Sequence, residues 1–185
     1  MFGPKELDLM NVYNPDLQNI RESAERTYGE ANSFYRKEDL YLKDIGKRIL
    51  SGELSSERDI YDECHAIASD LAKCCEMYLK ALILKSGKNY PTNRDGHNLK
   101  KLYDMLSEPI QNHLYQFCVN KEDCAEIIFT SFLENHSRDF MDARYYVTRE
   151  GWQGMSPIAV YTYAFNLGNI TKYLLSNWEN IQWQD

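Results

Sequence analysis

The side chains most suited to chemistry are concentrated in one segment, ENHSRDFMDARYYVTRE, at positions 134–150. It contains three arginines, two adjacent tyrosines, one histidine and four acidic residues, between two stretches with helical patterns. Guanidinium groups bind phosphates and aromatic rings stack on bases, so Arg138, Arg144 and Tyr145 are candidate binding residues for a nucleotide or RNA. The alternative is a closing turn that ion pairs between these arginines and neighbouring aspartates hold together.

A second group of candidates lies in a locally basic stretch. Residues 73–101 contain seven lysines and arginines but two acidic residues, in a chain whose formal net charge is -7. A phosphate or the acidic face of a partner could bind here, at the N-terminus of a short predicted helix. The alternative is a solvated helix end followed by a polar loop. The candidate residues of this stretch are Arg94, His97, Lys100 and Lys101.

The spacing of residues along the chain does not predict a metal or cofactor site. The chain has no H-E-x-x-H motif, no C-x-x-C pair, no Walker loop and no G-x-G-x-x-G motif. Its histidines fall in separate segments, at His65, His97, His113 and His136. We therefore expect no metal site and no cofactor.

Composition limits the class of protein further. The 185 residues are most simply one domain spanning 1–185, large enough for a substantial core. A pI near 5.2 argues against a protein that coats nucleic acid in general. Five cysteines, no signal-peptide pattern and no apolar run of ~18 residues lead us to expect reduced thiols, a cytoplasmic location and no membrane span.

Hydrophobic periodicity of the helical kind recurs along the chain, and no segment alternates with the period of a strand. The predicted helices cover about 15–35, 37–50, 57–86, 98–106, 107–118, 120–134 and 157–178. Asn-Pro and Ser-Pro pairs begin the first and last of them. Ser56 and Asp59 fit a capping box at the start of the third.

The helix predicted over 57–86 carries two adjacent apolar stripes, one including Ile67 and Leu71 and the other Ala68 and Ala72. An apolar arc this wide indicates a helix covered on two sides. We therefore predict an all-α, antiparallel up-and-down helical bundle built around this helix, with a long loop at 87–97.

Three motifs in this setting resemble the HEPN domain (higher eukaryotes and prokaryotes nucleotide-binding). They are LAKCCEMYLKALILKSG at 71–87, GHNLKKLYDML at 96–106 and FMDARYYV at 140–147. The resemblance covers about 57–178 and leaves residues 1–50 as extra N-terminal helices. It implies a four- to five-helix bundle that often forms a homodimer, and it implies that His97 fixes its loop onto the bundle.

The resemblance also implies two classes of function. Some family members are metal-independent ribonucleases, often toxins or defence effectors. Others are non-catalytic partners, often of nucleotidyltransferases. The nucleases carry an arginine, four to six residues and a histidine near the start of the last core helix, where the arginine stabilises phosphate charge and the histidine transfers protons.

That nuclease motif is missing from its expected place. No histidine follows the arginines of the 134–150 segment at the required distance. Arg58 and His65 have the spacing, and seven residues put them on one face of a helix, but they lie at the start of the central helix. They remain low-ranking catalytic candidates, and the alternative is a capping-region arginine and a half-buried histidine.

Three hypotheses follow for the function. The first is a non-catalytic HEPN-like module that binds RNA, a nucleotide or a partner protein such as a nucleotidyltransferase, in a defence or toxin–antitoxin-like system. The second is a metal-independent endoribonuclease. The third is a structural homodimeric interaction protein whose tyrosines make the interface.

Overall fold

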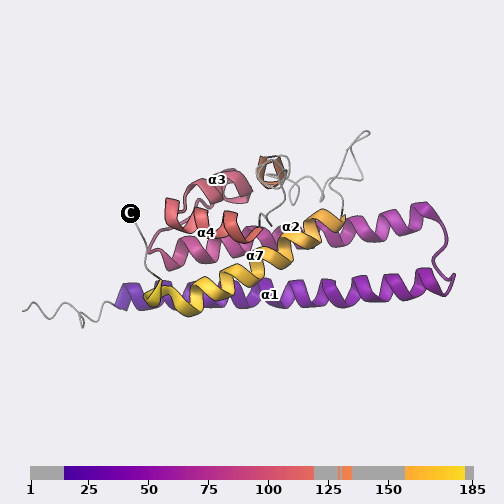
Figure 1. The fold of residues 1–185 in the computed structure, drawn as a ribbon, viewed down its shortest axis with the longest axis horizontal. Helices are drawn as coiled ribbons and strands as arrows, with labels where there is room; N and C mark the ends of the chain where they lie inside the picture. The colour runs from indigo at the N-terminus through magenta and orange to yellow at the C-terminus, as the bar shows by residue number, and fades with distance from the viewer. Residues whose placement is uncertain (1–14, 119–128, 130, 135–156, 182–185) are drawn as a thin grey trace, which may run out of the picture.

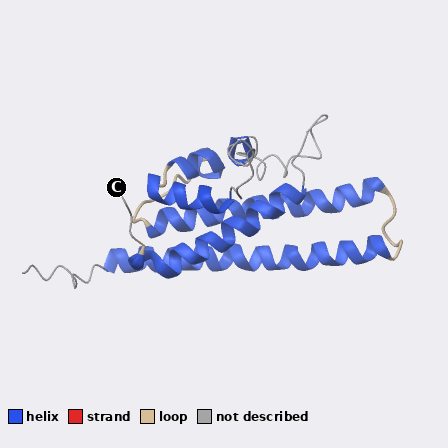
Figure 2. Cartoon of the chain, viewed as in Figure 1, coloured by secondary structure: helices blue, strands red, loops and turns tan. Residues whose placement is uncertain are grey.

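The structure is a computed structural model that describes residues 15–118, 129, 131–134 and 157–181. Within these ranges every regular element is a helix and no strand occurs (Figure 2). In chain order the elements are α1 (Pro15–Leu50), α2 (Glu57–Lys85), the 3₁₀ turn η2 (Arg94–His97), α3 (Leu99–Asp104), α4 (Glu108–Cys118), α7 (Pro157–Asn177) and the 3₁₀ turn η4 (Trp178–Asn180). The predicted all-α class is confirmed. The helix predicted over 120–134 falls mostly outside the described residues.

Helix α1 corrects the prediction of two helices over 15–35 and 37–50, because it is continuous through both ranges. Arg36 and Lys37, at the expected break, are straight-chain residues that favour a helix. The helix ends where Gly52 adopts a left-handed backbone with φ +76°. The sequence therefore places this end correctly but not the continuity of the helix.

Helix α2 begins after Ser56, as predicted, but the predicted capping box is wrong in its hydrogen bonds. The Ser56 side chain makes no capping hydrogen bond, and its backbone carbonyl accepts from the Ile60 N–H at 3.1 Å. At the other end Gly87 has φ +75° and the Lys88 N–H donates to the Ile83 carbonyl at 3.2 Å. This pattern is the glycine-terminated helix end that the sequence predicts.

Helices α1 and α2 form a long antiparallel hairpin, and α7 crosses both of them (Figure 1). Helix α3 packs against α2, and α4 packs against α7. The end of the hairpin where α1 passes into α2 extends beyond α7 (Figure 1). Among the described residues, that end consists of the two hairpin helices and the turn that joins them.

Helix α2 is the centre of the core, as its two apolar stripes predict. It contacts α1, α3 and α7. The buried members of the two stripes are Ile67, Leu71, Cys74, Tyr78 and Leu82 in one, and Ala68, Ala72, Cys75, Leu79 and Ile83 in the other. Covering α2 on several sides removes both stripes from water, and this burial is the main source of stability of the bundle.

Helix α1 faces α2 with a seven-residue repeat of buried positions. These are Ala24, Ala31, Glu38 and Ile45. Such spacing is typical of two helices packed as a coiled coil, in which the repeated positions are normally apolar. The repeat therefore places one carboxylate, that of Glu38, where an apolar side chain is expected.

Candidate binding site

The predicted phosphate-binding residues are carried by η2 and α3, which two asparagines start. The Asn93 side chain accepts a hydrogen bond at 3.0 Å from a backbone N–H two residues on, and Asn98 accepts one at 2.9 Å from the Lys101 N–H. Short polar side chains at these positions satisfy the first backbone donors of each turn. A Cβ on Gly96 would lie 1.9 Å from the Pro91 carbonyl oxygen, so this turn excludes any larger residue.

His97 joins the 87–97 loop to the central helix. Its Nδ1 lies 3.2 Å from Oε2 of Glu76, a carboxylate that is buried in the core. The other carboxylate oxygen accepts a hydrogen bond from Lys80 Nζ at 2.5 Å. The Lys80 ammonium in turn lies 4.8 Å from the centre of the Tyr90 ring. One side of His97 is thus occupied by an internal contact.

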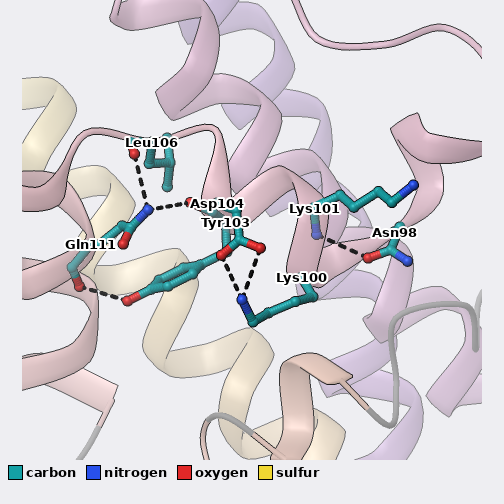
Figure 3. Close-up of polar contacts among 7 residues, drawn as sticks. All are labelled: Asn98, Lys100, Lys101, Tyr103, Asp104, Leu106 and Gln111. Carbon is teal, nitrogen blue, oxygen red and sulfur yellow. Dashed lines mark hydrogen bonds and ion pairs between the residues drawn. The ribbon is translucent and has the colours of Figure 1, made fainter.

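Lys100 and Lys101 also have acidic neighbours within the chain. Lys100 donates to both carboxylate oxygens of Asp104, at 2.6 and 2.8 Å (Figure 3), and Lys101 donates to Asp95 at 2.6 Å. These pairs offset the positive charge that the sequence suggested for the 73–101 stretch. A phosphate arriving here would compete with carboxylates already in place.

Helix α3 is fixed to α4 by three hydrogen bonds (Figure 3). The Tyr103 hydroxyl donates to the Gln111 carbonyl at 3.1 Å, and the Gln111 amide donates to the carbonyls of Tyr103 and Leu106 at 3.1 and 3.0 Å. The surface that carries the two lysines is therefore braced from both α2 and α4.

Several predicted site residues lie outside what the structure describes. Arg138, Arg144 and Tyr145 fall in undescribed ranges, and Arg94 begins η2 with an undescribed side chain. The meeting of 88–101 with 138–149 in one basic cleft therefore stays a prediction.

Of the alternative catalytic pair, Arg58 and His65, the structure describes the side chain of Arg58. The Arg58 side chain is 89% exposed at the start of α2, and its Nε lies 4.0 Å from Asp62 in a loose ion pair. His65 lies seven residues further along α2, and its side chain is outside the described part of the structure. A guanidinium this exposed lacks the low-dielectric surroundings that strengthen transition-state contacts.

The cysteines that the structure describes are free and hold no reactive thiolate in the core. Burial raises the pKa values of Cys74 and Cys118 to about 12, so both thiols are protonated at neutral pH. Among the described residues no cluster of His, Cys, Asp and Glu could hold a metal ion. No described helix is both long and apolar enough to span a membrane.

Sequence reasoning missed a groove of about 590 Å³ on the α1–α2 hairpin. A volume of this size is within the range of sites that hold small ligands. Its walls are Lys37, Glu38, Leu40, Tyr41 and Asp44 from α1 with Ile67 and Asp70 from α2. The groove depends on the register between two helices, and neither helix reveals it alone.

Glu38 is the least expected side chain in this groove. It is 4% exposed, and its Oε1 atom is buried without a hydrogen-bond partner. Lys37 Nζ lies 3.1 Å from this oxygen and forms an ion pair with it, but the Lys37 side chain is 71% exposed. Water screens much of the charge of such an ammonium, so it compensates the buried carboxylate only in part. The signal in the sequence was a carboxylate in an apolar seven-residue repeat.

Two apolar side chains flank the same groove in solvent. Leu40 is 67% exposed and Tyr41 is 41% exposed. The Tyr41 hydroxyl donates to Glu63 at 3.3 Å, and Glu63 also accepts from Arg48 at 2.9 Å. These contacts orient the Tyr41 side chain across the hairpin, from α1 toward α2.

Comparison of the chain with protein-family models, with curated proteins and with solved structures found no match in any of the three.

Proposed function

We propose that this protein is a non-catalytic helical module of the HEPN type that acts by binding a partner protein. The HEPN assignment rests on the three motifs in 71–87, 96–106 and 140–147 and on their order in an all-α chain. The binding assignment rests on the groove of the hairpin, which lies beside the first turns of α7, where the Tyr161 hydroxyl donates to Asp39 of α1 at 2.8 Å.

The observation that carries this proposal is the apolar groove and its exposed rim. Leu40 and Tyr41 lie at the groove, and Ile49 and Leu50 are 40% and 89% exposed further along α1. Scattered apolar residues on a surface are ordinary, but a hollow that combines apolar and charged side chains and has an exposed apolar rim is typical of a protein-binding site.

The polar surface of η2 and α3 supports a phosphate site less well. Lys100, Lys101 and His97 all contact carboxylates of the same chain. Phosphate binding by this surface would require those ion pairs to be exchanged. RNA or nucleotide binding is therefore the competing outcome of the test.

The first experiment compares the wild-type protein with Leu40→Ser/Tyr41→Ser in affinity purification from cells that express each of them, with quantitative mass spectrometry. We expect at least one protein to co-purify in stoichiometric amount with the wild type and to be depleted with the double variant. Tyr173→Ser, which changes an exposed tyrosine on α7, is the matched control and should retain that protein.

The same preparations are incubated with single-stranded and structured RNA in excess chelator. RNA that stays intact and unbound supports the proposal. Metal-independent cleavage that is lost in His65→Ala or Arg144→Ala would instead establish a ribonuclease. Tight RNA binding without a co-purified protein would establish a nucleic-acid-binding module.

A further inference from the structure

We propose that the groove on the α1–α2 hairpin receives a cationic side chain, an arginine or a lysine, that a partner protein presents next to an apolar residue. This inference rests on the proposed function, because it names the chemistry of the partner that binds there.

The charge of the groove is the first argument. Three carboxylates line it, those of Glu38, Asp44 and Asp70, against the single ammonium of Lys37. The side chains of Lys37 and Asp44 are both exposed, so water screens much of each charge, whereas that of Glu38 is buried. A concave surface with an excess of one sign attracts the opposite charge, which here is positive.

The geometry of Glu38 is the second argument. A carboxylate that is 96% buried normally accepts several hydrogen bonds, yet the contact that Oε1 makes is an ion pair at 3.1 Å with the ammonium of Lys37, whose side chain is 71% exposed. Because Glu38 lines the groove, a cation that enters the groove lies close to a carboxylate whose charge the exposed Lys37 ammonium offsets only in part. A guanidinium or ammonium group supplies the opposite charge together with N–H donors.

The apolar walls are the third argument, because they select the kind of cation. Ile67 at the wall and Leu40 at the rim suit the methylene stem of a long basic side chain and an apolar neighbour on the partner. The Tyr41 ring offers an aromatic surface to a guanidinium, which favours arginine over lysine. A small inorganic cation would leave these walls unused.

The test first selects peptides that bind the full-length protein from a display library of random twelve-residue sequences. The affinity of the selected peptides is then measured by fluorescence anisotropy. We expect enriched sequences with an arginine or lysine beside an apolar residue. Glu38→Gln should weaken their binding by about tenfold, since it removes the charge and keeps the shape. Glu30→Gln, an exposed acid on the same helix, is the matched control and should bind as the wild type does.

Thermal unfolding followed by circular dichroism accompanies each variant, because Glu38 also lies in the repeat that sets the register of the hairpin. If the Glu38→Gln variant melts at or above the melting temperature of the wild type, it is folded. Its weaker binding then comes from the lost carboxylate and not from unfolding. Equal binding by the wild type and Glu38→Gln, or enriched peptides without a basic residue, would overturn the inference.

The outcomes also separate this inference from the proposed function. Binding that Leu40→Ser/Tyr41→Ser abolishes but Glu38→Gln leaves unchanged would keep the partner-binding function and reject the cation. No enrichment over the double variant would reject both. Sedimentation that shows a wild-type dimer and a monomeric Leu40→Ser/Tyr41→Ser variant would assign the groove to a second copy of this chain instead.

Discussion

Single residues show how the structure uses charge inside an apolar helix. Glu76 and Lys80 are four residues apart on α2, and their side chains are 5% and 12% exposed. A buried pair contributes little net stability, but removal of one partner leaves an uncompensated charge in the core. Glu76 also contacts His97, so the same carboxylate positions the loop before α3.

Replacement of Glu76 with alanine should therefore lower the free energy of unfolding far more than removal of a carboxylate from an exposed ion pair. We expect Glu76→Ala to lower the free energy of unfolding by about 3 kcal/mol, measured by urea denaturation. Asp104→Ala, which breaks the exposed pair with Lys100, should cost less than about 1 kcal/mol. Similar losses in the two variants would show that Lys80 reaches solvent without its partner.

Elements pack closely where α7 crosses α2. Gly168 on α7 lies against the ring of Tyr78, which is 1% exposed. A Cβ at position 168 would be 2.9 Å from the Tyr78 hydroxyl oxygen and 3.0 Å from Cζ. The absent side chain is what allows the two helices to approach at this point.

Alanine at Gly168 tests this contact. Alanine favours a helix over glycine by about 1 kcal/mol, but the clash with a buried ring costs about 1–3 kcal/mol, so we expect Gly168→Ala to lower the melting temperature. Gly46→Ala on α1 is the matched control, because nothing lies within 4 Å of its added Cβ, and it should raise stability. Tyr78→Phe should recover part of the loss. A more stable Gly168→Ala would mean that α7 shifts freely.

The elements also show what a sequence can and cannot predict. Glycines at Gly52 and Gly87 end the helices as expected, because a left-handed backbone is a local property that residue type reveals. The continuity of α1 was missed although Arg36 and Lys37 favour a helix, because such propensities are weak and the packing of α2 along the whole length of α1 is not visible in the sequence. The groove around Glu38 was missed for a related reason, because it depends on the pairing of two distant segments.

The candidate site was predictable only in part. The sequence placed His97 on a loop that returns to the bundle, and the structure pairs it with Glu76. The partner of Lys100, Asp104, lies four residues further along α3, a helical spacing that the sequence shows, whereas the pairing of Lys101 with Asp95 depends on the turn that Asn93 and Asn98 create. Local charge counts therefore overestimated how much positive charge this surface offers.

The whole molecule should lose stability in alkaline solution. Burial raises the pKa of the Cys118 thiol from 9.0 to about 12, and those of Tyr103 and Tyr163 from 10.0 to about 12. Because the unfolded chain releases these protons first, the stability they contribute is complete below about pH 9 and is lost as the pH rises toward 12. The slope is at most about 1.4 kcal/mol per pH unit for each group.

Urea denaturation between pH 7 and 11 measures this loss. We expect a flat profile to about pH 9 and then a decline, and Cys118→Ala should decline less steeply because one titrating group is gone. The two profiles should run parallel below pH 8. A wild-type profile that rises above pH 9, or identical slopes in both proteins, would contradict the assignment of a buried neutral thiol.

The uninterrupted α1 has a mechanical consequence. A helix of 36 residues is about 54 Å long, and within α1 proline occurs at the first position, Pro15. A rod of this kind resists bending, so a sideways load on the far end of the hairpin acts as a torque about the place where α7 crosses it (Figure 1). The hairpin is thus a lever arm, and a small rotation at its base becomes a displacement of several ångströms at its end.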